Sequence, residues 1–288
     1  MLLYCTTLLS RLPVAVHYWI SDWLLFPLVY HVARYRRKIV AKNLRNSFPE
    51  KSEAERQQIA RAFYHQFCDL IVEIIYCYGR SNEEMTQRME IRNLDEAQRY
   101  IHTSGGVISM FTHMGNWEWL AAVGDLVDPD VTVAKVYRKL KNKRVDDLMM
   151  SLRTKWKGIY VEKQRVLREM VRLKNEKKPV LWGLNSDQKP RPEVTRTWLT
   201  FLNQETGFVD GGEVLAAKFN YPVFYGKVLR VKRGYYTVEL KLLAANPQEL
   251  PQGEITRRYA QELEANIKEQ PYLWLWSHNR WKWKRPAQ

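Results

Sequence analysis

The sequence predicts an α/β protein in which helices flank a mixed central sheet, preceded by an N-terminal membrane-anchoring helical segment. From Gly106 onward, short β-branched runs alternate with amphipathic stretches, which is the pattern of a sheet covered by helices. The last two predicted strands are joined by residues 232–234, whose short turn predicts a hairpin and therefore an antiparallel pair. We divide the chain into an anchor, residues 1–38, and a single domain, residues 39–288.

The anchor is predicted from the charge distribution at the N-terminus. Only Arg11 and Asp22 are charged before residue 34, and a basic cluster follows at residues 34–38. No charge-free run reaches the roughly 20 residues of a spanning helix, and a mid-span Asp costs about 2.5–3.5 kcal/mol. The segment also lacks the features of a cleaved signal peptide. We therefore expect it to lie in, or dip into, the bilayer with its basic cluster at the headgroups. A buried amphipathic helix pair is the alternative.

Two capping signals mark the helices that follow. Ser52 and Glu55 have the spacing of a capping box and start a long amphipathic helix that ends near Gly79. Ser81 and Glu84 repeat this spacing and start a shorter helix.

The sheet and its covering helices are predicted from residue 106 to the C-terminal region. Apolar runs bounded by turn residues predict strands at residues 107–112, 131–137, 179–185, 221–229 and 235–243. Periodic stretches predict helices at residues 117–127, 141–156, 163–175, 212–220 and 256–269. No repeat or linker divides this region, so we expect one domain.

The composition limits the classes of function. With 45% apolar and 27% charged residues among 288, the chain suits a folded protein with a substantial core. Cys5, Cys68 and Cys77 form no disulfide or metal framework and are expected to be reduced packing residues. The net charge of +15 attracts nucleic acid, anionic headgroups, phosphorylated substrates or acidic proteins. Eleven Trp and sixteen Tyr favour a membrane interface, although aromatic rings also stack on unpaired bases.

The most informative motif lies where the first predicted strand ends, at His113. A glycine and an asparagine turn the chain after it, and Glu118 follows five residues after the histidine. Because a spacing of five does not place two side chains on one helix face, the turn must bring them together, as a base and the acid that orients it. Six His and 31 acidic residues in this chain give about 0.65 such pairs by chance. His17 and Asp22 form a second pair, without a strand-to-helix setting.

Polar residues follow three of the predicted strands, namely His113, Arg138 and Asp187. Functional groups of α/β proteins collect at the carboxyl ends of strands, so these residues predict one site. Asp187 could instead be a turn or helix-cap residue, and Arg153, in a helical run, could be a solvated charge. The sequence has no phosphate-binding glycine loop, nucleophile elbow or metal-ligand spacing. His113 would therefore have to activate a hydroxyl supplied by a substrate.

The C-terminal residues 274–286 interleave aromatic and basic side chains. Such a segment could stack on bases or enter a headgroup layer. It could also pack its Trp residues on a sheet edge while Arg280 and Lys282 face an anionic ligand. Composition alone leaves these three interpretations open.

Together these residues resemble the lipid A late acyltransferases of the lauroyl and myristoyl type, within the glycerolipid acyltransferase superfamily. The turn from His113 to Glu118 is similar to the family's signature of a His and an acid separated by four residues. The other similar segments follow in the same order as in the family: residues 36–49, residues 136–142 with Asp146, Arg153, residues 187–188, residues 212–223 and residues 276–282. The resemblance covers residues 10–286, and the ordered set is more specific than any one motif.

The resemblance implies transfer of a fatty acyl chain from an acyl carrier protein thioester to a hydroxyl of a lipid A precursor. Residues 39–288 would then be the acyltransferase domain. His113 would be the general base, worth roughly 10²–10⁴-fold in rate, and Glu118 would fix its tautomer. Arg153 would stabilise the developing oxyanion or bind phosphate, and Asp187 would orient Arg153.

The resemblance also implies the other contacts and partners. Asn116, Arg138 and Lys282 are the expected substrate-binding residues. Acyl carrier protein, the anionic lipid A precursor and the membrane are the expected partners, at the cytoplasmic face of the inner membrane. Beyond the carrier-protein thioester no cofactor or metal is expected, and no nucleic acid. The chain departs from the family in its N-terminal hydrophobic segment, which Asp22 interrupts.

Two alternatives remain open on the sequence. Within the same class, the acceptor would be a phospholipid, an aminolipid or another glycolipid. Outside it, the chain would be a non-catalytic basic protein that binds nucleic acid or membrane.

Overall fold

The computed structural model describes the backbone of residues 2–286 and the side chains of residues 6–286. Its centre is a seven-stranded sheet with the order β1-β9-β8-β2-β5-β3-β4. The strands are β1 (Met89–Arg92), β2 (Gly106–Phe111), β3 (Thr132–Tyr137), β4 (Ile159–Glu162), β5 (Val180–Asn185), β8 (Val223–Lys232) and β9 (Tyr235–Ala244). All neighbouring strands are parallel except β8 and β9, whose hairpin pairs antiparallel. The predicted mixed sheet is thus confirmed.

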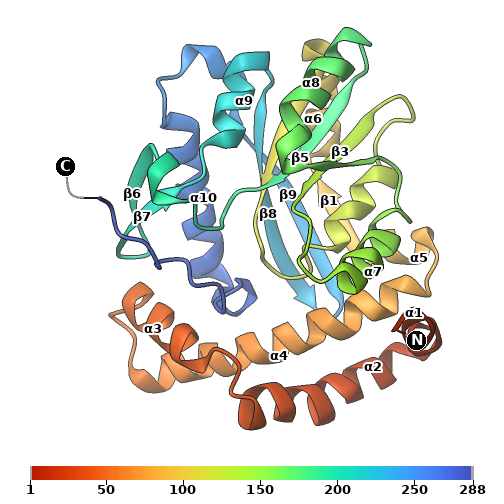
Figure 1. Ribbon diagram of the computed structural model, residues 1–288, viewed down its shortest axis with the longest axis vertical. Helices are drawn as coiled ribbons and strands as arrows, with labels where there is room; N and C mark the ends of the chain where they lie inside the picture. Colours follow the sequence, from red (N-terminus) through yellow and green to blue (C-terminus); the bar gives the residue numbers. More distant parts are fainter. Residues whose placement is uncertain (1, 287–288) are drawn as a thin grey trace.

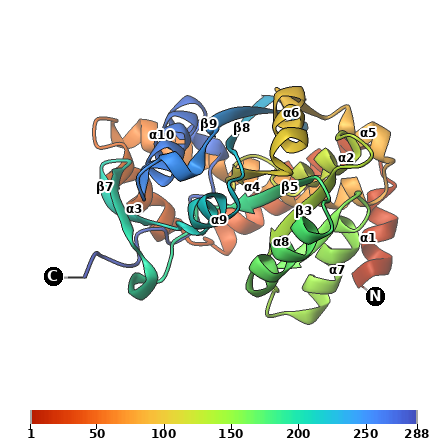
Figure 2. The same ribbon diagram turned by 90° about the horizontal axis from the view of Figure 1, so that it is seen from above.

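Helices flank both faces of this sheet (Figure 2). They are α6 (Leu94–Ser104), α7 (Lys143–Arg153), α8 (Val166–Asn175), α9 (Gly211–Phe219) and α10 (Glu254–Glu269). A separate hairpin of β6 (Thr197–Phe201) and β7 (Gln204–Phe208) lies beside α10 (Figure 1). Every residue of β2 is buried, as expected of a central parallel strand that is covered on both faces.

The structure differs from the predicted elements mainly at short segments. Strands β1 and β4 have four residues each and lie at the two edges of the sheet, and neither was predicted. Helix α6 and the β6–β7 hairpin were also missed. The helix predicted at residues 117–127 is instead a 3-10 helix, η3 (Trp119–Asp125). Its tight winding fits a crowded position, since a Cβ on Gly124 would lie 2.0 Å from the Lys157 carbonyl oxygen.

Both capping predictions are confirmed. The hydroxyl of Ser52 accepts from the backbone amide of Glu55, and the Glu55 carboxylate accepts from the amide of Ser52, at the start of α4 (Glu53–Tyr78). At α5 (Asn82–Thr86), the hydroxyl of Ser81 accepts from the backbone amide of Glu84, without the reciprocal contact described for Ser52. Cys68 and Cys77 of α4 are buried and free, as expected, whereas the side chain of Cys5 lies outside the described residues.

Helix α4 crosses the edge of the sheet at which β2 and β8 end (Figure 1). The N-terminal helices pack along the outer side of α4. They are α1 (Leu2–Ser10), α2 (Val14–Ile20) and the π-helical turns η1 (Ser21–Leu25) and η2 (Pro27–Val32), followed by α3 (Arg37–Ser47). No helix within residues 2–286 is long and apolar enough to cross a membrane.

Asp22, the acid that interrupts the apolar N-terminus, is paired with a cation from the sheet. Its carboxylate accepts two hydrogen bonds of 2.8 Å from Arg233, in the β8–β9 turn. Arg233 also binds the buried Asp69 of α4, which Ser21 and Arg230 contact as well. These contacts fasten the inner face of the N-terminal segment to α4 and to the sheet.

The outer face of the same segment is apolar and open to solvent. Trp23 is 69% and Val32 74% exposed, and Trp19, Leu24 and Leu28 are each more than half exposed. The segment is therefore neither a spanning helix nor a fully buried helix pair. It is an amphipathic layer with one packed and one exposed face.

Replacement of Arg233 by Met is expected to lower the free energy of unfolding by about 2–4 kcal/mol, because it leaves Asp69 buried without its main counter-ion. Denaturant unfolding measures this change. Arg92→Met is the matched control, since Arg92 pairs with Glu90 at the surface, where both side chains are 57% exposed. Such a pair contributes about 0–1 kcal/mol. Equal losses in the two variants would contradict a structural role for Arg233.

Candidate active site

The site is built on the turn that follows β2. The chain leaves the strand at Phe111 and reverses at Gly115, whose φ of +58° disfavours a side chain. A Cβ at Gly115 would also lie 2.9 Å from the ring of Tyr236. The turn therefore needs glycine both for its conformation and for its close contact with β9, and it presents His113 at the sheet edge.

Asp187 reaches His113 because β5 lies beside β2. Phe111 and Asn185 are partners in the register, so both strands end at the same level. The two side chains follow these strand ends, and Nδ1 of His113 lies 2.6 Å from Oδ1 of Asp187. Oδ2 of Asp187 accepts from the backbone amide of His113 at 3.1 Å and from the indole of Trp274 at 2.9 Å. The carboxylate is only 3% exposed and is held by three donors.

These contacts shift the pKa of both partners. Burial by itself would lower the pKa of His113, but the charge and hydrogen bond of Asp187, with the charge of Glu118, raise it above its ordinary value of 6.5. Burial would raise the pKa of Asp187, but His113 and the hydrogen bond from Trp274 hold it well below its ordinary range. Asp187 is thus ionised, and it stabilises the imidazolium form of His113.

The other ring nitrogen of His113, Nε2, is not bound to a carboxylate among the described residues. With Nδ1–H donated to Asp187, Nε2 carries the lone pair, and it lies 3.3 Å from the amide nitrogen of Gln188. The ring of Trp117 packs against the imidazole at 5.2 Å, and the His113 side chain remains 16% exposed. This arrangement suits a general base whose reactive nitrogen can reach a bound hydroxyl.

Glu118 does not contact His113, although the sequence analysis predicted this contact. Its carboxylate accepts two hydrogen bonds, of 3.0 and 2.9 Å, from Arg153 at the end of α7. Both side chains are 17% exposed, and the ion pair raises the pKa of Arg153 although burial opposes this. The expected pairs are therefore exchanged: Asp187 orients His113, not Arg153, and Glu118 holds Arg153.

The direction of the chain after Gly115 explains why Glu118 pairs with Arg153 and not with His113. Gly115 turns the backbone away from the strand, and Glu118 sits at the N-cap of η3, where it meets α7. Its charge still acts on His113, so Glu118 and Arg153 form a second pair next to the first. An apolar hollow of about 250 Å³ adjoins this ion pair, lined further by Ile74, Cys77, Trp119, Met149, Leu152 and Trp156.

Asn116, expected to bind substrate, is fully buried and points away from the open side. Its amide donates to Glu73 of α4 at 2.9 Å. Glu73 also accepts from the hydroxyls of Tyr18 and Tyr236, at 3.1 and 3.0 Å. Burial raises the pKa of Glu73 to about 7, against the hydrogen bond from Asn116. Asn116 therefore anchors the turn to α4, and its role in substrate binding stays a prediction.

Sequence reasoning missed Glu73, although a signal for it was present. Gln66, Asp69 and Glu73 recur at helical spacing within the apolar stripe of α4. Polar residues on the buried face of a helix need partners inside the protein, so this spacing indicates an internal network.

Arg138 and Lys282 are exposed at two separate places. Arg138 follows β3 at the carboxyl edge of the sheet, as predicted. Lys282 lies over the ring of Trp283, with its Nζ 4.4 Å from the ring centre. Neither side chain contacts His113 in the described hydrogen bonds, and both stay predictions as substrate-binding residues.

The C-terminal segment runs beside the turn that carries His113. The amide of Leu275 donates to the His113 carbonyl at 3.1 Å, and the amide of Gly115 donates to Leu273. Asn43 of α3 donates to the carbonyls of Trp276 and His278. The motif around Asn43 and the C-terminal motif, far apart in the sequence, thus meet next to the site.

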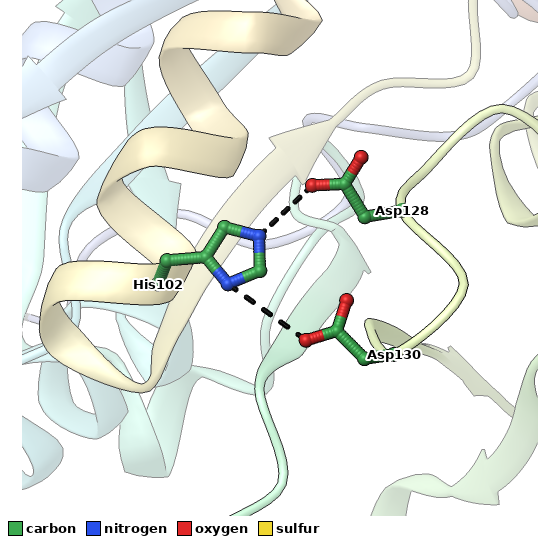
Figure 3. A group of neighbouring side chains, drawn as sticks. All are labelled: His102, Asp128 and Asp130. Carbon is green, nitrogen blue, oxygen red and sulfur yellow. Dashed lines mark hydrogen bonds and ion pairs between the residues drawn. The ribbon is translucent and has the colours of Figure 1, made fainter.

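One further cluster lies at the opposite edge of the sheet. His102 of α6 lies 2.9 Å from Asp128 and 3.9 Å from Asp130, which precede β3 (Figure 3). All three side chains are more than 40% exposed. Ligand atoms within 4.8 Å of one another would suit a cation, but exposed groups of this kind commonly form surface ion pairs. The cluster joins α6 to the loop before β3 and takes no part in the His113 site.

Comparison with known proteins agrees with this geometry. Residues 4–283 match the family described as bacterial lipid A biosynthesis acyltransferase. No curated protein gives a significant match. Because the match covers nearly the whole chain, including the turn at His113 and the acids and arginine around it, the protein belongs to the bacterial lipid A biosynthesis acyltransferase family and is an acyltransferase.

Proposed function

We propose that the protein transfers an acyl chain from an acyl carrier protein thioester to a hydroxyl of a lipid A precursor. The observation that carries this proposal is the pair of His113 and Asp187, which leaves Nε2 of His113 in contact with the amide of Gln188 only, among the described hydrogen bonds. The family itself implies an acyl donor and a lipid A precursor as substrates. Within this family, a base whose described hydrogen bonds include no serine or cysteine side chain fits direct attack by the acceptor.

In the proposed reaction His113 first accepts a proton from the acceptor hydroxyl and later donates a proton to the leaving thiolate. The acceptor hydroxyl attacks the thioester carbonyl while Nε2 of His113 takes its proton. The resulting imidazolium is stabilised by Asp187. The tetrahedral intermediate then collapses, the carbon–sulfur bond breaks, and the thiolate takes the proton back from His113. The products are an ester on the acceptor and the free thiol of the donor.

Arg153 and Glu118 have the second role in this proposal. Nε and Nη2 of Arg153 are bound to Glu118, which fixes the plane of the guanidinium. Its remaining donors would stabilise the developing oxyanion or bind a phosphate of the acceptor. The apolar hollow beside the pair would receive the start of the acyl chain, because its wall consists mainly of aliphatic and aromatic side chains.

We further propose that the exposed face of the N-terminal segment seats in the cytoplasmic surface of the inner membrane. Trp19, Trp23 and Leu24 would enter the interface. The basic cluster at residues 34–38 would meet anionic headgroups. The segment lies along α4, at the edge of the sheet that carries His113, so the site would face the bilayer.

The alternatives fare differently. Another acceptor, such as a phospholipid, an aminolipid or another glycolipid, would use the same residues. Base stacking by Trp274 and Trp276 is disfavoured, because both side chains are buried.

Replacement of His113 by Ala is expected to abolish acyl transfer to a lipid A precursor, a loss of about 10²–10⁴-fold or more, and to leave folding and membrane binding intact. Transfer of a radiolabelled acyl chain from carrier protein measures it. His102→Ala is the matched control, since His102 lies at the opposite edge of the sheet and should retain full activity. Undiminished transfer by His113→Ala would exclude this mechanism.

Asp187→Asn is expected to reduce kcat by about 10²–10⁴-fold, because the tautomer of His113 is no longer fixed. It should also move the acid limb of the profile of kcat/KM against pH. In the wild type, His113 is protonated and inactive below its raised pKa, so activity falls as the pH drops toward 6.5. Without the carboxylate, burial alone lowers this pKa, and the limb moves to lower pH. A limb that stays in place would mean that Asp187 does not control His113.

The double replacement of Trp19 and Trp23 by Ser is expected to weaken binding to anionic vesicles at least about tenfold, because burying each indole contributes roughly 1.5–3 kcal/mol. Co-sedimentation with vesicles measures this. Leu167→Ser with Val171→Ser is the control, because these residues are similarly exposed on α8, away from the N-terminal segment. Equal binding by the two double variants would argue against the proposed membrane face.

A further inference from the structure

A second hollow, of about 240 Å³, lies between the C-terminal segment, the β6–β7 hairpin and the loop after β5. Lys189 lines it and follows Asp187 by two residues. The hollow is therefore lined by the loop that carries Asp187, whereas Glu118 and Arg153 do not line it. Its wall combines cations with large aromatic rings: Lys189, Arg280, Trp198, Trp281 and Trp283.

Arg280 is the unusual residue of this wall. Its side chain is 3% exposed, yet no carboxylate within the described part of the chain lies at ion-pairing distance from it. Nη2 donates to the carbonyl of Gly207 at 2.6 Å, and the guanidinium packs over the ring of Phe208. Nε is buried without a partner among the described residues. A buried arginine is normally paired with an acid, so this one has unused capacity to bind an anion.

The surroundings of Arg280 add positive charge. Burial lowers the pKa of Arg280 to about 10. Burial also lowers the pKa of Lys189, and the neighbouring charges of Lys282, Arg36 and Arg280 lower it further. The positive charges of Lys282, Arg36 and Arg280 thus act together on Lys189.

The neighbouring acids compensate this charge only in part, since the charge of Asp187 raises the pKa of Arg280 against the effect of burial. Glu205, at the rim, is 56% exposed and lies 3.7 Å from Arg285. Asp187 is bound by His113 and Trp274. His278 accepts from the amide of Lys189, and burial lowers the pKa of His278 to about 4, so its ring is neutral. A bound anion would relieve the remaining repulsion.

The aromatic side of the hollow favours an anion that is attached to a sugar ring. Trp281 is fixed by a hydrogen bond of 2.7 Å from its indole to Thr206, and Trp283 is 43% exposed. An indole presents a flat apolar face with a polar edge, which suits the C–H face of a sugar ring.

We propose that Arg280 and Lys189 form a binding site for a phosphate ester carried by a sugar, which holds a phosphorylated headgroup beside His113. Guanidinium and ammonium groups supply the charge-assisted hydrogen bonds that phosphate oxygens accept. The tryptophans pack on the sugar. The proposal rests on the proposed function for its context, because the headgroup would belong to the acceptor whose hydroxyl His113 activates. It adds a second contact point that fixes which part of that acceptor reaches the base.

The test measures binding of glucose 1-phosphate to the full chain, by isothermal titration, without any acyl donor. Arg280→Met and Lys189→Met are each expected to weaken binding at least tenfold. Lys218→Met is the matched control, because it removes the same charge from an exposed position on α9 and should bind as the wild type does. Lys189 is a partly exposed loop residue, so its variant remains informative where Arg280→Met fails to fold.

Two further ligands identify the source of the phosphate. Inorganic phosphate lacks the sugar and should bind more weakly than glucose 1-phosphate; equal binding would overturn the assignment to a sugar phosphate. Glycerophosphoethanolamine represents a phospholipid headgroup, and tighter binding of this compound would overturn it in favour of the phospholipid. Binding of glucose 1-phosphate that is unchanged in Lys189→Met and in a folded Arg280→Met, or no binding to the wild type, would exclude the site.

These outcomes are separate from the fate of the proposed function. A protein that binds glucose 1-phosphate through Arg280 but transfers no acyl chain would retain the site and lose the function. A protein that transfers the acyl chain but does not depend on Arg280 and Lys189 for phosphate binding would retain the function and lose the site.

Discussion

The contact between His113 and Asp187 depends on one constraint, the parallel pairing of β2 and β5. Neither residue has a local reason to meet the other, since they are 74 positions apart. Their strands end at the same level in the register, and parallel strands deliver their carboxyl ends to one edge. Once these ends coincide, Trp274 and the amide of His113 complete the set of donors to the carboxylate. The order of the strands in the sheet thus determines which residues meet in the site.

Below the catalytic turn lies a buried polar layer that ties it to the rest of the fold. Tyr236 packs against Gly115 and donates to Glu73, which also binds Asn116 and Tyr18. These groups come from α2, α4, β9 and the turn itself. Buried polar groups are costly when any partner is lost, so the layer allows one arrangement of the turn. The N-terminal helices are therefore part of the support of the active site.

The sequence allowed prediction of those features whose signals are local. The capping box at Ser52, the N-cap at Ser81, the central strands and the β8–β9 hairpin each depend on residues close together in the chain. The edge strands β1 and β4 escaped notice because four residues carry little periodicity and their pairing partners lie far away. The same reason explains the exchanged partners at the site. Spacing placed Glu118 near His113, but only the order of strands in the sheet brings Asp187 to Nδ1.

The fastening of Asp22 to Arg233 has a consequence for where on the acceptor the acyl chain is attached. On the proposed seating, the exposed tryptophans mark the level of the bilayer surface, and Arg233 connects them rigidly to the strands that position His113. The distance between His113 and the bilayer surface would then be fixed by the fold. A hydroxyl at that depth in a membrane-held molecule would meet the imidazole, while one nearer the tails or further into the water would not. The fold would thereby determine which hydroxyl of the acceptor is acylated.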